Sequence, residues 1–96
     1  MPDIVIELLV TEIGLAKLGA RGISAEHAGQ LPRNQHITAR NPHRGGAADA
    51  RRLLIGRTNG GRALTLVIER TIDPTTWLIV TGWNATEVER RLLGGQ

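Results

Sequence analysis

The second half of the chain alternates between apolar and polar positions, which is the pattern of a half-buried strand. Residues 52–58 and 62–70 are two such stretches, and residues 59–61, Asn-Gly-Gly, carry the turn chemistry of a β-hairpin. Residues 76–83 provide a further strand, so we predict a three-stranded antiparallel meander. Within its middle strand, three apolar residues fall on one face: Leu64, Leu66 and Ile68.

The first half of the chain combines strand and helix signals. Residues 4–10 are β-branched and apolar enough to form a strand. Thr11 and Ser24 are typical N-cap residues, so two short helices are expected after that strand, the first ended by glycine and the second by proline. Residues 35–40 alternate and predict another strand, whereas residues 41–49 have the Asn, Pro and Gly content of a long polar loop.

A last helix is expected after the meander. Thr86 and Glu89 match the S/T-x-x-E capping box, and Gly94 marks the helix end. The element order β-α-α-β-β-β-β-α indicates an α+β protein. We expect residues 1–96 to form one domain, in which two short N-terminal helices and a C-terminal helix pack on a mainly antiparallel sheet of four strands. Residues 4–10 could add a fifth, N-terminal strand.

Arginine dominates the charge of the middle segment. The chain has 12 basic and 9 acidic residues, which gives a net charge of +3. Eight arginines lie between residues 33 and 70, against only Asp49 and Glu69. Because the planar guanidinium fork suits bidentate contact with phosphate, a phosphate-rich partner is one hypothesis. The alternative is that these side chains only solvate the strand edges.

The composition also narrows the chemistry. The absence of cysteine excludes a disulfide framework, a thiolate zinc site and a cysteine nucleophile. The three histidines fall on different predicted elements, no P-loop is present, and Ser24 is better explained as a helix cap than as a nucleophile, so no metal and no cofactor are expected. No apolar run approaches the roughly 20 residues of a membrane span, and no signal peptide is evident. We therefore expect a cytoplasmic domain with no membrane contact.

Metal-independent cleavage of a phosphodiester remains open, in which a base takes the 2′-OH proton and cations stabilise charge on phosphorus. The hairpin is expected to bring Arg57, Glu69 and Arg70 near one another, with His36 or His43 as a further candidate base. Glu69 and Arg70 are adjacent, so their side chains point to opposite faces unless a bulge intervenes. A cross-strand ion pair for Glu69, and packing or solvation for the histidines, are the structural alternatives.

The only aromatic residues are two tryptophans. Trp83 ends a predicted strand and could stack on a nucleic-acid base, although a tryptophan in a strand is more often a core residue. Trp77 is expected in the core.

Several motifs, in this order and spacing, resemble the BrnT-type toxins over roughly residues 15 to 93. The segment 17–28 resembles their KHGVSFEEA-like stretch, and 52–64 resembles their R-x-x-x-I-G…G-R-x-L hairpin. The segments 67–70, 81–86 and 89–91 resemble their V-x-x-E-R, I-S-A-R-x-A-T and E-R endings.

The resemblance implies a BrnT-like member of the RelE/ParE superfamily, whose members are toxins of bacterial type II toxin–antitoxin pairs. Such toxins are typically metal-independent ribonucleases that block translation and are held inactive by a cognate antitoxin. By position, the resemblance places catalysis on Arg57, Glu69 and Arg70, to which we add His43 from the arginine-containing loop. The expected RNA-binding residues are Arg40, Arg44, Arg51, Arg52, Arg62, Trp83 and Arg90.

Two departures from the family pattern affect the expected activity. The Lys-His pair of the family aligns with Ala20-Arg21, and its Arg and Lys in the I-S-A-R-K-A segment align with Trp83 and Asn84. The alternatives are therefore a binding module that has lost catalysis and a ParE-type toxin that acts on DNA gyrase. A homodimer and a toxin–antitoxin hetero-oligomer both remain open.

Overall fold

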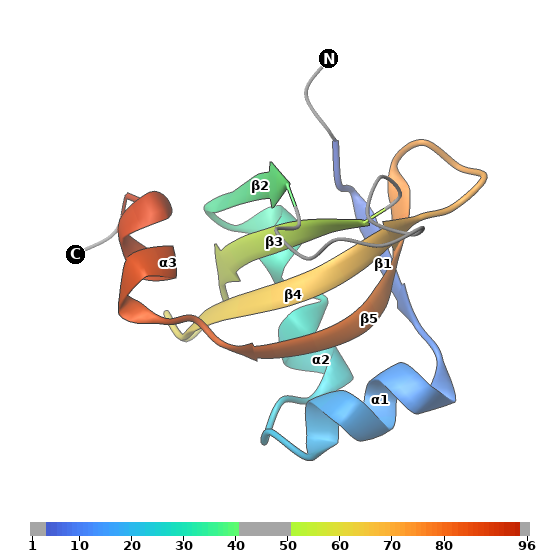
Figure 1. The fold of residues 1–96 in the computed structure, drawn as a ribbon, viewed down its shortest axis with the longest axis horizontal. Coiled ribbons are helices and arrows are strands. Elements are labelled where there is room, and N and C mark those ends of the chain that lie inside the picture. Colours follow the sequence, from blue (N-terminus) through green and yellow to red (C-terminus); the bar gives the residue numbers. More distant parts are fainter. Residues whose placement is uncertain (1–3, 41–50, 95–96) are drawn as a thin grey trace.

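A five-stranded mixed sheet with the strand order β1-β5-β4-β3-β2 forms the centre of the fold (Figure 1). The computed structural model describes residues 4–40 and 51–94. Along the chain, the elements are β1 (Glu7–Val10), α1 (Glu12–Gly19), α2 (Ala25–Ala28), the 3₁₀ helix η1 (Leu31–Arg33), β2 (His36–Arg40), β3 (Arg51–Arg57), β4 (Ala63–Arg70), β5 (Thr76–Asn84) and α3 (Glu87–Leu92).

The α+β class and the antiparallel meander are confirmed, and the sheet has five strands because the N-terminal strand that the sequence left open is present. β2, β3, β4 and β5 pair in antiparallel fashion, and β1 joins the outer side of β5 in parallel, with Leu9 opposite Leu78. Leu8 and Val10 of β1 pack against the core, which explains why this short strand adds to the sheet. Its apolar character is evident in the sequence, but the strand with which it pairs is not.

The main core lies between the sheet and the N-terminal helices. Figure 1 shows α1 and α2 together on one side of the sheet, with α3 apart from them. Gly82 of β5 allows this close packing, because a Cβ at that position would lie 2.6 Å from Cδ2 of Leu66 and 3.0 Å from Cδ2 of Leu18. The core includes Leu64, Leu66 and Ile68, as predicted, together with Leu18, Ile23, Leu31, Leu54 and Trp77.

The predicted helix caps are confirmed by their hydrogen bonds. The hydroxyl of Thr11 accepts from the backbone N–H of Gly14 at 3.0 Å, and that of Ser24 accepts from His27 at 3.0 Å. At the start of α3, Thr86 and Glu89 form the complete capping box. These local signals fix where each helix begins, and the apolar pattern fixes which side of the sheet α1 and α2 cover.

Candidate nucleic-acid interface

The sheet face that points away from α1 and α2 carries polar side chains toward its two ends, with the buried residues Leu53, Ile55 and Val67 between them. We call it the α3 face, because Glu89 of α3 contacts Thr65 and Trp83 there. Its members alternate along the strands with the core residues. They are Arg51, Leu53, Ile55 and Arg57 of β3, Ala63, Thr65, Val67 and Glu69 of β4, and Thr81 and Trp83 of β5.

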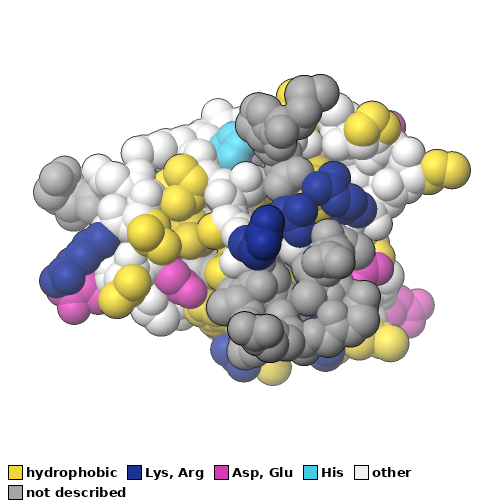
Figure 2. Space-filling model, turned by 45° about the horizontal axis from the view of Figure 1, so that its top comes forward, with side chains coloured by type: hydrophobic (Ala, Val, Ile, Leu, Met, Phe, Trp, Pro, Cys, Tyr) yellow, Lys and Arg dark blue, Asp and Glu magenta, His cyan; other side chains and the backbone are white. Residues whose placement is uncertain are grey.

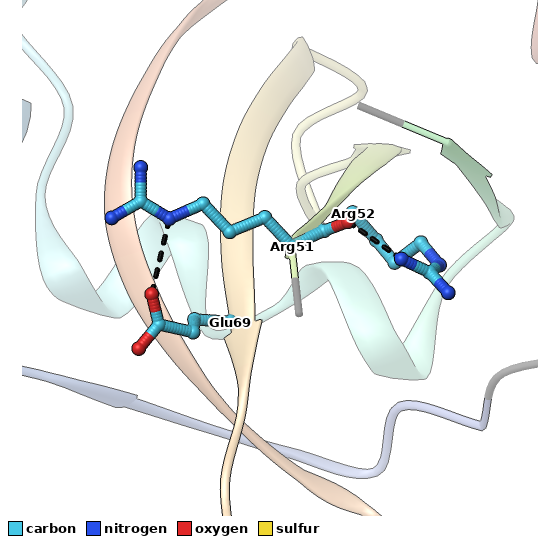
Figure 3. A network of polar contacts seen from close by, with 3 residues as sticks. All are labelled: Arg51, Arg52 and Glu69. Atoms are coloured by element: carbon cyan, nitrogen blue, oxygen red, sulfur yellow. Dashed lines mark hydrogen bonds and ion pairs between the residues drawn. The ribbon is translucent and has the colours of Figure 1, made fainter. Parts of the chain in front are cut away.

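Arg51 and Glu69 form an ion pair across β3 and β4 (Figure 3). They are register partners, and Nε of Arg51 donates to Oε1 of Glu69 at 3.0 Å. Both side chains remain about one third exposed, at 36% and 34%. An exposed pair of this kind contributes about 0.2–1 kcal/mol to stability, so its groups are held in place but remain accessible. The ion-pair alternative for Glu69 is therefore confirmed.

Three further arginines lie on the opposite face at the same end of the sheet. Figure 3 shows the side chain of Arg52 directed away from Arg51, with its guanidinium donating to the Arg51 carbonyl at 2.8 Å. Arg40 is the register partner of Arg52 across β2 and β3. The guanidinium carbon of Arg70 lies 5.0 Å from the centre of the Trp77 ring, a cation–π distance.

These four residues, Arg40, Arg51, Arg52 and Arg70, are called here the arginine end. They come from the end of β2, the start of β3 and the end of β4, which the antiparallel pairing brings to one edge of the molecule. In Figure 2, which brings the top of the Figure 1 view forward, some of the Lys and Arg side chains lie next to one another near the centre, and others lie at the left and along the lower side. A concentration of guanidinium groups creates a positive potential that attracts polyanions.

The prediction that the hairpin brings Arg57 close to Glu69 and Arg70 is wrong. The hairpin pairs Arg57 with Ala63 and Arg51 with Glu69, so six positions separate Arg57 from Arg51 and Glu69 along the strands. At about 3.3 Å per residue this is about 20 Å. Arg57 instead donates to the Gly61 carbonyl at 3.0 Å. The turn at residues 59–61 lies where the sequence predicts it. The bond to Gly61 keeps the Arg57 side chain next to that turn, away from Glu69.

Glu69 and Arg70 point to opposite faces, as expected from their adjacency. The β4–β5 register shifts between Val67 and Ile68, but beyond the shift Glu69 and Arg70 still pair with successive residues, Leu78 and Trp77. The irregularity therefore does not turn both side chains to one face.

The remaining predicted residues have mainly structural contacts. Arg62 donates to Oδ1 of Asn84 at 2.8 Å and to the Gly22 carbonyl at 3.1 Å, which ties the hairpin to the loop between α1 and α2. Arg90 lies on α3 and donates to the Ala85 carbonyl at 3.4 Å. His36 has Nδ1 at 2.8 Å from the Asn34 carbonyl oxygen. His43 and Arg44 lie outside the described residues.

The far end of the α3 face is organised around Glu89, a residue that the sequence marks only as a helix cap. Its Oε1 accepts from the Thr65 hydroxyl at 2.8 Å, from the backbone N–H of Thr86 at 2.8 Å and from the indole N–H of Trp83 at 3.1 Å. Trp83 is half-buried and lies opposite Thr65 in the register. One carboxylate thus joins α3 to both β4 and β5.

This network also sets the ionisation of Glu89. Partial burial acts to raise the pKa of this carboxyl, but the hydrogen bonds from Thr86, Thr65 and Trp83 outweigh it, so the net pKa lies below the ordinary value. Glu89 is therefore charged at neutral pH and accepts these hydrogen bonds as a carboxylate.

The described part of the chain holds neither a candidate metal site nor a candidate membrane span. No group of three or more His, Asp or Glu side chains there could hold a metal ion, and no helix within residues 4–40 or 51–94 is long and apolar enough to cross a membrane.

No model of a known protein family matches the sequence, and neither does any curated protein. The resemblance to BrnT-type toxins therefore rests on the order and spacing of the sequence motifs.

Proposed function

We propose that this chain is the toxin of a bacterial type II toxin–antitoxin pair, of the BrnT-like class in the RelE/ParE superfamily, and that it binds and cleaves RNA in the cytoplasm. Its partner in this role is a cognate antitoxin. The order and spacing of the motifs support the class, and the α+β architecture, with helices before and after an antiparallel meander, is compatible with it.

The clustering of arginines at the arginine end is the main observation that supports RNA binding. Four arginines from three strands lie at one end of the sheet. Arg51 and Arg52 project to opposite faces, so a phosphate backbone that passes around this end meets guanidinium groups on either side. Contacts of this kind are independent of base sequence and weaken with salt.

Arg51 and Glu69 are the pair best placed for cleavage. They lie on the same face at 3.0 Å, whereas Arg57 and Arg70 do not share a site with Glu69. In the proposed step, Glu69 removes the proton of a ribose 2′-OH, whose oxygen attacks the adjacent phosphorus, and Arg51 stabilises the added negative charge. The bond from phosphorus to the 5′-oxygen of the next nucleotide then breaks, which leaves a 2′,3′-cyclic phosphate, and the departing 5′-oxygen takes a proton from water. Arg51 thereby takes the cationic role that the family pattern assigns to Arg57 and Arg70.

A second function is supported by the separation of the three residues that the resemblance marks as catalytic. Because Arg57 lies about 20 Å along the hairpin from Glu69, and Arg70 faces away from it, the chain is also consistent with an RNA-binding module that does not cleave. The two functions differ in turnover and share the same binding surface.

Cleavage of a defined RNA in the presence of a chelator separates these functions. The wild-type protein is compared with Glu69→Gln, which keeps the shape of the side chain but cannot act as a base. Glu87→Gln is the matched control, because it removes the same charge from an exposed position on α3. Cleavage that is lost only in Glu69→Gln supports the ribonuclease, RNA binding without cleavage supports the module, and absence of both activities contradicts both functions.

A further inference from the structure

Trp83 differs from Trp77 in how its ring is held. Trp77 is 1% exposed, and its indole N–H donates to the Ile4 carbonyl at 3.0 Å within the core. Trp83 is half-buried on the α3 face, and its N–H points to a carboxylate, with Nε1 at 3.1 Å and 3.3 Å from the two oxygens of Glu89. Its polar edge is therefore satisfied inside the protein, while the residue as a whole remains partly exposed.

Glu89 itself is fixed from two directions. The backbone N–H of Thr86 and the hydroxyl of the fully buried Thr65 both donate to its Oε1 at 2.8 Å. The carboxylate cannot move without breaking these bonds, so it holds the indole edge at a defined place on the face. A fixed aromatic ring loses less conformational entropy on stacking than a mobile one.

The position of this ring relative to the arginine end suits a single strand. Trp83 lies opposite Thr65, and Glu69 is four positions further along β4 on the same face, which is about 13 Å. That distance exceeds the step of about 3.4 Å between stacked nucleotides in a duplex strand. A strand that reaches both places therefore spans about four nucleotides. Both faces of a base inside a duplex are covered by its neighbours, so the base that stacks on Trp83 has to be unpaired.

We propose that Trp83 stacks on an unpaired base of the bound RNA and that Glu89 is the positioning residue that orients its ring. This inference rests on the proposed RNA binding and assigns that surface a substrate class, single-stranded RNA with an accessible base at the α3 end. Stacking of this kind tolerates any base, because every base has an aromatic face.

The test uses a short 2′-O-methyl oligouridylate, which cannot be cleaved through its 2′ position, and an abasic strand with the same number of phosphates. The wild-type protein is expected to bind the base-bearing strand more tightly, with a change in Trp83 emission. Trp83→Ala should weaken that binding about tenfold and leave abasic binding unchanged. Glu89→Gln should have a smaller effect in the same direction, and Glu87→Gln, the matched charge control, should have none.

A double-mutant cycle separates positioning from helix stability. Trp83→Phe keeps an aromatic ring but removes the indole N–H, so Glu89→Gln should affect stacking in the wild-type background and much less in the Trp83→Phe background. The capping of α3 is weakened equally in both backgrounds and cancels. Equal effects in the two backgrounds would overturn the role of Glu89.

The outcomes distinguish this inference from the proposed function. If the protein binds the base-bearing and abasic strands equally, and Trp83→Ala changes neither, the stacking inference fails while RNA binding stands. If the wild-type protein binds neither strand, both fail. Circular dichroism and the emission of the buried Trp77 report whether each variant is folded.

Discussion

The two ends of the sheet use charged side chains in different ways. At the arginine end, Arg51 and Glu69 form an ion pair with both side chains about one third exposed. At the α3 end, Glu89 accepts hydrogen bonds from three residues, one of them the fully buried Thr65. Exposed ion pairs add little stability, whereas a carboxylate with several donors connects elements. Glu89 therefore holds α3 against the sheet, whereas the Arg51–Glu69 pair stays partly exposed and adds little to stability.

Both ends depend on the same core, so the largest expected effect is a change that disturbs both. Leu66 is fully buried beneath the middle of β4. Leu66→Ala should lower the free energy of unfolding by about 2–5 kcal/mol, because it leaves a cavity under α1. Denaturant unfolding measures this loss. A loss well below 1 kcal/mol would show that the core carries less of the stability than its burial indicates.

The α3 end should be the more sensitive of the two to removal of one carboxylate. Glu89→Ala leaves the Trp83 indole and the Thr65 hydroxyl without their acceptor and breaks the capping box, which should cost about 1–2 kcal/mol. Thermal unfolding measures the loss, with Glu87→Ala as the control on the same helix. If Glu89→Ala and Glu87→Ala lost the same stability, Glu89 would have no special role in holding α3 to the sheet.

At the arginine end, we expect substitutions to affect RNA binding more than stability. Arg51→Ala combined with Arg52→Ala should lower the free energy of unfolding by less than Leu66→Ala does, because both arginines are partly exposed and the Arg51–Glu69 ion pair contributes only about 0.2–1 kcal/mol. The slope of log binding constant against log salt for single-stranded RNA should become less steep by about 0.7 for each phosphate that the double variant no longer neutralises. Fluorescence anisotropy at several salt concentrations gives this slope. An unchanged slope would exclude these arginines from the RNA-binding surface.

The sequence predicts the local structure of this protein well, because each signal acts within a few residues. Thr11, Ser24 and the Thr86–Glu89 pair cap the helices as expected, and Asn-Gly-Gly at 59–61 turns the hairpin. The side of the sheet that α1 and α2 cover also follows from alternation at Leu64 and Leu66. The parallel addition of β1 to β5 did not follow, since the choice of a strand's neighbour depends on contacts distant in sequence.

The candidate site was predicted less well, and the reason lies in the register of one hairpin. Arg57 and Glu69 were predicted to lie close together because they belong to the two strands of the same hairpin. The observed register pairs Arg57 with Ala63 and places Glu69 opposite Arg51. Counting outward from residues 59–61 would have given this pairing. The bond from Trp83 to Glu89 had no comparable signal, because it depends on how α3 folds back after β5.

The smallest expected effect is the pH dependence of the α3 end. The pKa of Glu89 lies below its ordinary value of 4.5, although burial alone would raise it, because Thr86, Thr65 and Trp83 donate hydrogen bonds to the charged form. The unfolded chain therefore takes up a proton at higher pH than the folded protein. The stabilisation is complete above about pH 5 and is lost as the pH falls through the lower pKa of the folded state.

The stability advantage of wild type over Glu89→Gln, measured by urea unfolding, should then shrink on acidification. Glu87→Gln shows how much of any change follows from removing a carboxylate elsewhere on α3. A constant advantage between about pH 6 and pH 3 would mean that this carboxylate does not couple α3 to the sheet.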